Sequence, residues 1–127
     1  MIRVIVCGCG KMGSKIVNLI AQDKEMLLAG IIERPDHPKI GSLVEGRLVE
    51  DNLERFINAP DVIIEFSNPI ATIQHAAIAS QVKKAMVIGT TGLSEEQISH
   101  LKELAKNFPC VLAPNMALGV NLLFKLV

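Results

Sequence analysis

With 127 residues, half of them hydrophobic and none of them Trp or Tyr, the chain is long enough for one domain with an aliphatic core and leaves little room for a second. Thirteen basic and thirteen acidic residues leave no net charge, and no stretch is apolar for long enough to span a membrane, which argues against nucleic acids and membranes as partners. Three cysteines, two of them one residue apart beside glycines, make a poor disulfide framework, so we expect a reduced, cytoplasmic protein.

Short apolar runs of strand length alternate along the chain with segments of helical periodicity. The runs are nearly continuous in Val, Ile and Leu, which is typical of parallel strands covered by helices on both faces. The alternation predicts an α/β fold: a Rossmann-like, doubly wound parallel sheet in a single domain. About five strands are expected, at residues 2–7, 27–32, 62–66, 85–88 and 110–113.

Helix signals lie between these strands. An amphipathic helix should follow the first strand, and capped helices should begin at three later points. In the first helix, the apolar residues expected to face the sheet are Met12, Ile16, Val17 and Ile20. The predicted starts of the later helices are Asp51 with Glu54, Asn68-Pro69, and Ser94 with Gln97. The second of these starts precedes the apolar residues Ile70, Ile73 and Ala77, and the third precedes Ile98, Leu101, Leu104 and Ala105. The segment 33–47, interrupted by prolines and glycines, is expected to be an exposed loop. An apolar helix is predicted after Gly119 and shows no C-cap before Val127, so we expect the natural protein to continue.

The segment Gly8-Cys9-Gly10-Lys11-Met12-Gly13 matches G-x-G-x-x-G between the first predicted strand and its helix. Gly8 would make the tight turn, Gly10 would admit a pyrophosphate close to the backbone, and Gly13 would let helix and strand pack closely. The phosphates would lie on the helix N-terminus, whose free N–H groups favour anions. Glu33 follows Gly13 by about 20 residues, where a carboxylate accepts the adenosine ribose hydroxyls. A tight turn without a ligand is the alternative interpretation.

Arg34 follows Glu33 directly. It could contact the 2′-phosphate of NADPH, or it could be a solvated loop charge. The adjacent carboxylate and guanidinium are compatible with the use of both NADH and NADPH.

Three further segments follow predicted strands, at the sheet edge where α/β proteins bind ligands. Gly89 and Gly92 permit a sharp exit from a strand, while Thr90 and Thr91 offer donors to a nicotinamide ribose or carboxamide. Each segment alone would be only a loop. The three are Phe66-Ser67-Asn68-Pro69, Gly89-Thr90-Thr91-Gly92 and Ala113-Pro114-Asn115-Met116.

Five motifs occur in a recognisable order: GCGKMG at 8–13, ER at 33–34, DVIIEFS at 61–67, GTTG at 89–92 and APNMALGVN at 113–121. In this order they resemble dihydrodipicolinate reductase, also called 4-hydroxy-tetrahydrodipicolinate reductase, a family of bacterial lysine and diaminopimelate biosynthesis. The likeness covers essentially all of the chain, and its last two motifs are more selective than the glycine pattern.

The resemblance implies a dinucleotide-binding domain over residues 1–127, in which NADH or NADPH donates a hydride to a small cyclic dicarboxylate. It implies that Gly8 to Gly13 hold the pyrophosphate, Glu33 the adenosine ribose and Arg34 the extra phosphate. It also implies that the nicotinamide half is surrounded by Phe66, Ser67, Gly89, Thr90, Thr91, Ala113, Pro114, Asn115 and Met116. The family usually has serine where this chain has Ala117, so that hydroxyl is missing.

Members of this family continue into a C-terminal substrate domain with a His-His motif, which this sequence lacks. We therefore expect an N-terminal part of such a protein, with no catalytic residue and no complete active site of its own. In the family the substrate domain makes the oligomer, so a monomer or a different homo-oligomer is expected here.

His37, His75 and His100 are spaced like no metal site or catalytic triad. Each is expected to be a surface or capping histidine. No metal site is therefore predicted.

The cysteines are expected to differ in exposure. Cys7 and Cys110 should be buried small apolar residues, whereas Cys9 should lie in an exposed turn beside a helix N-terminus, where its thiol would be activated. Glu65 lies inside an apolar run and needs a partner if it is buried, but the sequence does not identify that partner.

Two hypotheses from different classes remain. In the first, the chain is the coenzyme-binding half of a reductase, and another domain supplies the rest of the chemistry. In the second, it is a complete, non-catalytic nucleotide-binding or assembly module whose apolar terminal helix makes an oligomer contact.

Overall fold

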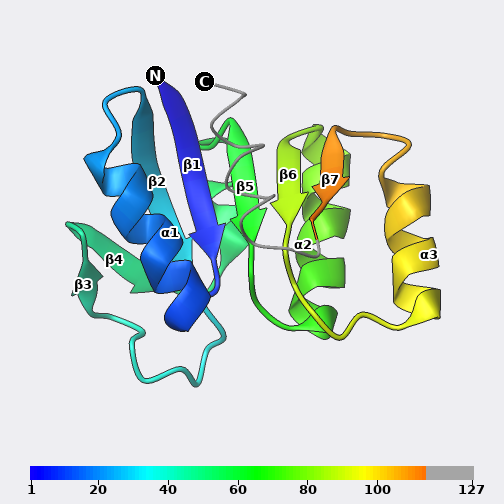
Figure 1. Ribbon diagram of the computed structural model, residues 1–127, viewed down its shortest axis with the longest axis horizontal. Helices are drawn as coiled ribbons and strands as arrows, with labels where there is room; N and C mark the ends of the chain where they lie inside the picture. Colours follow the sequence, from blue (N-terminus) through cyan, green and yellow to red (C-terminus); the bar gives the residue numbers. More distant parts are fainter. Residues whose placement is uncertain (114–127) are drawn as a thin grey trace.

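Figure 1 shows a computed structural model of the protein, in which residues 1–113 are described. Seven strands form one sheet in the order β3-β4-β2-β1-β5-β6-β7. All neighbours pair in parallel except β3 and β4. The strands are β1 (Ile2–Cys7), β2 (Met26–Ile32), β3 (Leu43–Val44), β4 (Arg47–Glu50), β5 (Val62–Glu65), β6 (Ala85–Ile88) and β7 (Cys110–Leu112). The predicted α/β fold is confirmed, although the prediction of about five strands was too low.

The two additional strands lie in and just after the segment predicted to be a loop. Glu45 and Gly46 both have positive φ, at 50° and 78°, and they form a two-residue hairpin turn between β3 and β4. Val49 of β4 is buried and pairs with Ile31 of β2, which extends the parallel sheet by one strand. The prediction of an exposed loop over 33–47 was therefore wrong from Leu43 onward. Glu-Gly is a weaker hairpin signal than Asn-Gly or Asp-Gly.

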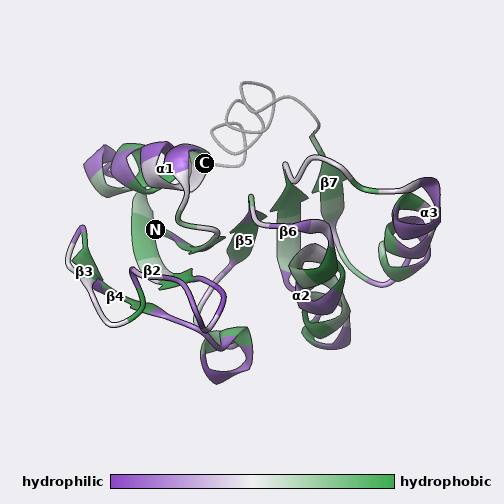
Figure 2. Ribbon diagram, turned by 90° about the horizontal axis from the view of Figure 1, so that it is seen from below, coloured by the Kyte–Doolittle hydropathy of each residue, from purple (hydrophilic) through white to green (hydrophobic). Residues whose placement is uncertain are grey.

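Helices cover both faces of the sheet, as Figure 2 shows from the edge where the parallel strands end. Helix α1 (Lys11–Gln22) lies on one face, while α2 (Pro69–Val82) and the short 3₁₀ helix η1 (Leu53–Phe56) lie on the other. Helix α3 (Glu95–Leu104) packs beside α2. Because successive side chains of a strand point to opposite faces, β1 contributes to a separate core on each side.

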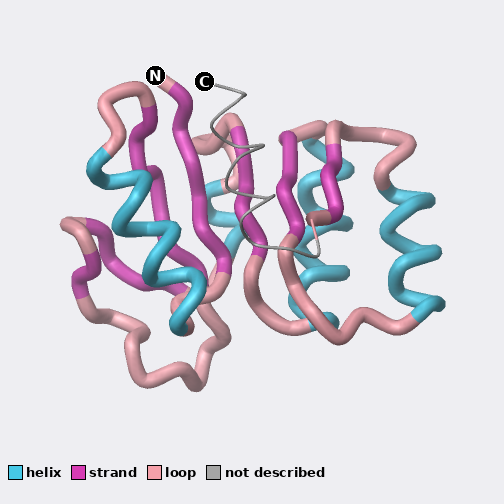
Figure 3. The backbone as a smooth tube through the Cα atoms, in the orientation of Figure 1, coloured by secondary structure: helices cyan, strands magenta, loops and turns pink. Residues whose placement is uncertain are grey.

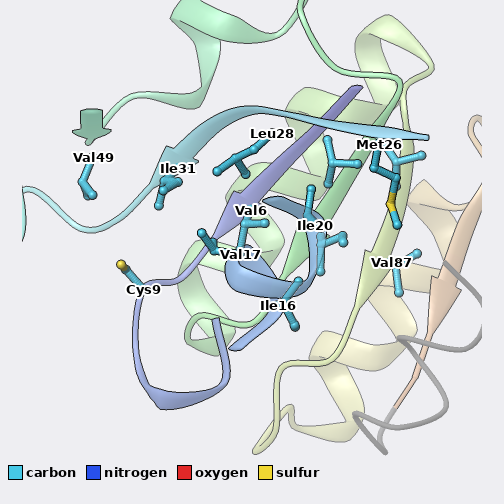
Figure 4. Packing of buried hydrophobic residues seen from close by; sticks show 13 residues of the cluster. Val6, Cys9, Ile16, Val17, Ile20, Met26, Leu28, Ile31, Val49 and Val87 are labelled. Carbon is cyan, nitrogen blue, oxygen red and sulfur yellow. The ribbon is translucent and has the colours of Figure 1, made fainter. Parts of the chain in front are cut away.

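The core under α1 is built from aliphatic side chains and is shown in Figure 4. Val4 and Val6 of β1 meet Ile16, Val17 and Ile20 of α1 there. On the opposite face, Ile5 and Cys7 belong to the core beneath α2 and α3, together with Ile63, Ala76, Met86 and Leu101. Burial on both faces explains why the strand sequences are apolar throughout.

Two predictions about the helices were wrong in detail. Met12, in the first turn of α1, is 44% exposed and does not face the sheet as predicted. Helix α2 buries Thr72, Ala76 and Ala79 and leaves Ile70 exposed. The cap of η1 is Asn52, whose side chain accepts the N–H of Glu54, and not the neighbouring Asp51.

The other two predicted helix starts are confirmed. The Asn68 side chain accepts the N–H of Ala71 at 2.9 Å, with Pro69 at the first helical position. At α3, Ser94 and Gln97 form a reciprocal capping box, in which each side chain accepts the other residue's main-chain N–H.

Several predictions fall on the last fourteen residues, which lie outside the described ones: the roles of Pro114, Asn115 and Met116, the position of Ala117 and the helix after Gly119. Within residues 1–113, no helix is both long and apolar enough to cross a membrane. Figure 3 traces the connections, including the long one between β2 and β3 that borders the site described next.

The capping box makes a stability prediction. Replacing Ser94 with Ala should lower the free energy of unfolding by about 1 kcal/mol, because the first turn of α3 loses its side-chain acceptor. Urea denaturation measures this loss. Ser99→Ala, an exposed position inside the same helix, is the matched control and should change stability by less than about 0.5 kcal/mol. Equal effects of the two substitutions would contradict the role given to the cap.

Candidate coenzyme site at the carboxyl edge of the sheet

The strand order reverses between β1 and β5. From β1 the chain adds β2 and then β4 on one side, and it returns to β5 on the other side before adding β6 and β7. Open α/β sheets bind ligands at such a point, in the crevice outside the carboxyl ends of the strands. The glycine segment follows β1, and Phe66-Ser67 follows β5, so both predicted groups meet there.

The turn after β1 is packed so tightly that two of its glycines have no room for a side chain. A Cβ on Gly8, whose φ is +105°, would lie 2.3 Å from the carbonyl oxygen of Phe66. A Cβ on Gly13 would lie 1.8 Å from the carbonyl oxygen of Gly8. The first and third glycines of the pattern therefore join β1, α1 and the end of β5 in close contact.

Gly10 differs, because a Cβ there would meet no heavy atom within 4 Å. It is the N-cap residue of α1, where no side chain caps the helix and the first turn has no acidic residue. Within residues 1–113, the N–H groups of Gly10, Lys11 and Met12 have no acceptor. These groups can bind an anion at the positive end of α1, and the bare Gly10 lets it approach the backbone.

Glu33 follows β2 and turns toward the glycine segment. Its carboxylate accepts the main-chain N–H of Cys9 at 2.6 Å and that of Arg34 at 2.9 Å. Its side chain is only 9% exposed, and His37 Nε2 lies 3.7 Å from Oε2. The structure thus holds this carboxylate beside the N–H groups at the start of α1, where the sequence predicts the adenosine ribose to bind.

Arg34 is at the rim of the same region. Its Nε lies 3.0 Å from Asp36 Oδ1, and both side chains are largely exposed. Opposite this loop, the N-terminal part of α2 closes a pocket of about 200 Å³. The residues that line it include Gly8, Glu33, Arg34, Asn68, Gln74 and His75.

The nicotinamide-side predictions fall at the ends of β5, β6 and β7. A Cβ on Gly89 would lie 2.1 Å from the Phe66 ring, so the ring fits there because residue 89 has no side chain. Thr90 is buried, and its hydroxyl lies 2.7 Å from that of Thr72 on α2, whereas Thr91 is exposed. The Thr90 hydroxyl therefore braces α2, and the exposed polar side chain of this segment is that of Thr91. Ala113 is buried and follows β7.

Beneath this edge lies a buried carboxylate, that of Glu65, the last residue of β5. Glu65 is completely buried, and its oxygens bond to His75 Nδ1 at 2.8 Å and to the Ser67 hydroxyl. The partner that the sequence left unnamed is therefore a histidine ten positions later, on α2. The pair ties the end of β5 and its following loop to the helix that closes the pocket.

The thiol of Cys7 lies against the same carboxylate. Burial, and next the charge and hydrogen bond of Glu65, raise the pKa of Cys7 well above its usual range. Burial alone raises the pKa of Cys110 to about 11. The prediction of an exposed Cys9 was wrong, because its side chain is 1% exposed and belongs to the core cluster drawn in Figure 4.

The histidine predictions hold only in part. His100 is exposed and the Nδ1 of His37 accepts the main-chain N–H of Lys39 at 3.1 Å, both as expected, but His75 faces the buried carboxylate of Glu65. Donor atoms of Cys7, Glu65 and His75 lie within 4.8 Å of one another, and Glu65 already receives hydrogen bonds from His75 and Ser67. This arrangement is that of a hydrogen-bonded carboxylate. Glu65 in an apolar run was the one sequence signal of the pairing.

Removal of the His75 imidazole tests how much its hydrogen bond to the buried Glu65 contributes to stability. We predict that His75→Ala lowers the free energy of unfolding by about 2 kcal/mol, since a hydrogen bond to a charged or buried partner is lost. Urea denaturation again measures the change. The control is His100→Ala on α3, an exposed histidine whose loss should cost less than about 0.5 kcal/mol. Equal stability of the two variants would contradict the importance of the Glu65–His75 contact.

Comparison with known sequences assigns the chain to a family. The sequence model of the family described as "Dihydrodipicolinate reductase, N-terminus" matches residues 2–116. The 4-hydroxy-tetrahydrodipicolinate reductase of Aquifex aeolicus is 45% identical, over 98% of this chain and 51% of the relative. That of Syntrophus aciditrophicus is 39% identical, over 100% and 51%. The chain thus spans about half the length of the curated relatives it matches.

Comparison with solved structures finds the same family. A dipicolinate-bound dihydrodipicolinate reductase from Paenisporosarcina is similar with a TM-score of 0.74 and 31% identity, over 99% of this chain and 52% of the other. Homoserine dehydrogenase from S. aureus has a TM-score of 0.73 at 17% identity, over 88% of this chain and 32% of the other, which shows a shared fold alone.

Proposed function

This chain belongs to the dihydrodipicolinate reductase family, and we propose that residues 1–127 are the dinucleotide-binding domain of an oxidoreductase that uses NADH or NADPH. We also propose that the reaction of the whole protein is hydride transfer to a small cyclic dicarboxylate in lysine and diaminopimelate biosynthesis. The observation that carries the assignment is the set of main-chain N–H groups at Gly10, Lys11 and Met12, beside the tightly packed Gly8 and Gly13.

The residues of the site fit such a coenzyme. Gly10, Lys11 and Met12 would hold the pyrophosphate, Glu33 the adenosine ribose, and Arg34 a 2′-phosphate where there is one. Phe66, Ser67 and the segment from Gly89 to Thr91 would border the nicotinamide. When bound, the coenzyme supplies the hydride, while the protein positions it and excludes water.

The segment Ala113 to Met116 completes the proposed nicotinamide surroundings by family resemblance. We assign no acid or base to this domain and propose that a second domain supplies substrate binding and proton transfer. A cytoplasmic location is part of the proposal, supported by the three free thiols among the described residues.

Substitution of Gly10 tests the proposal. Gly10→Ala adds a methyl group that meets nothing in the protein itself but stands where the pyrophosphate would approach. We expect unchanged stability and affinity for both NADH and NADPH weakened at least about tenfold, measured by calorimetric titration. Gly30→Ala, whose Cβ would make an ordinary 3.5 Å contact inside β2, is the control and should bind normally.

Two outcomes would count against the proposal. Wild-type protein that binds neither coenzyme would remove it. A Gly10→Ala variant that binds both coenzymes as tightly as the wild type would show that the ligand does not use this turn.

A further inference from the structure

The loop that follows β2 folds back over the glycine turn. Within the loop, the N–H of His37 bonds to the carbonyl of Arg34 at 3.0 Å, and that of Ile40 bonds to the carbonyl of His37 at 3.1 Å. Gly41 then donates to the carbonyl of Val49 on β4 at 2.9 Å. Figure 3 shows this connection at the edge of the sheet where α1 begins. Its side chains are therefore held close to the coenzyme site.

One of these side chains reaches the turn itself. Lys39 Nζ donates to the carbonyl oxygen of Cys9 at 3.4 Å, although 30 positions separate the two residues. The N–H of the same Cys9 is bonded to Glu33. The ammonium and the ribose-binding carboxylate thus lie at the two ends of one residue of the turn.

The other basic side chains of the loop already have partners. Arg34 is paired with Asp36, and His37 lies beside Glu33 and accepts the main-chain N–H of Lys39 through Nδ1. Among residues 1–113, no carboxylate lies within 4.0 Å of the Lys39 ammonium. A ligand can therefore bind the Lys39 ammonium without displacing an acidic partner among these residues.

A 2′-phosphate makes a specific demand on this site. It replaces a hydroxyl that Glu33 would accept, and it carries a charge of about −1.5 to −2 at neutral pH. The phosphate and the carboxylate repel each other, so a site that accepts NADPH must place a cation next to the carboxylate. Lys39 meets that requirement, because its flexible stem can move the ammonium from the Cys9 carbonyl to the phosphate.

On the basis of the proposed function, we propose that Lys39 is a specificity-determining residue, which binds the 2′-phosphate of NADPH and acts beside Arg34. It makes no contact with the part of the coenzyme that NADH shares. Loss of its charge should therefore change the preference between the two coenzymes rather than binding in general.

The experiment measures the affinity of the 127-residue chain for NADPH and for NADH by calorimetric titration at low ionic strength. We expect Lys39→Ala to weaken NADPH about tenfold and NADH less than twofold, as loss of one charge-assisted contact implies. Lys39→Arg keeps the charge and should retain NADPH binding. Lys24→Ala removes an exposed lysine from the α1–β2 connection, at the opposite edge of the sheet, and should affect neither coenzyme.

A second probe separates the 2′-phosphate from the pyrophosphate. Adenosine 2′,5′-bisphosphate carries the 2′-phosphate and no pyrophosphate, and Lys39→Ala should weaken it about as much as NADPH, while leaving 5′-AMP unchanged. Equal losses for NADH and NADPH would place Lys39 on the pyrophosphate and overturn this inference alone, as would no loss for either. Wild-type protein that binds no coenzyme would overturn the proposed function, and this inference with it.

Discussion

Close contact between the backbone of the first βα turn and its neighbours is the constraint on which the site depends. Gly13 packs on the carbonyl of Gly8, and Gly8 packs on the carbonyl of Phe66, at separations that leave no room for a Cβ. These two contacts fix where α1 begins relative to β1 and β5. As a consequence, the first N–H groups of α1 point out at the edge where the strand order reverses, and Gly10 leaves the approach to them open.

Different side chains make contacts on the two sides of the turn. Glu33 and Lys39 bind the N–H and the carbonyl of Cys9, so the loop after β2 brings opposite charges to the side where we propose that the adenosine ribose binds. On the other side, the buried Glu65 connects the end of β5 to α2 through His75. The Glu65–His75 contact positions the loop that contains Phe66 and Ser67. The wall of the pocket and the strand edge are thus held by a polar network, which is costly to bury unless every member is paired.

Much of this could be predicted from local sequence signals, and the failures have physical reasons. The glycine spacing, the Asn68-Pro69 start and the Ser94–Gln97 box each depend on neighbours in sequence, and their structures follow the prediction. By contrast, the β3–β4 hairpin needs Val49 to be buried against β2, a tertiary contact that its Glu45-Gly46 turn hardly signals. The inward side chain of Cys9, the Thr72–Thr90 contact and the partners of Glu65 depend on which faces meet after folding. Lys39 was missed for the same reason, because only the folded loop brings it to Cys9.

The most direct test of the account is an NMR titration of ¹⁵N-labelled protein with NADH, followed at the main-chain N–H groups. If a diphosphate lies on the start of α1, the signals of Gly10, Lys11 and Met12 should shift most and saturate together, while those of Lys24 and Ser99 stay in place. Saturable binding that leaves the signals of Gly10, Lys11 and Met12 unmoved would contradict the account.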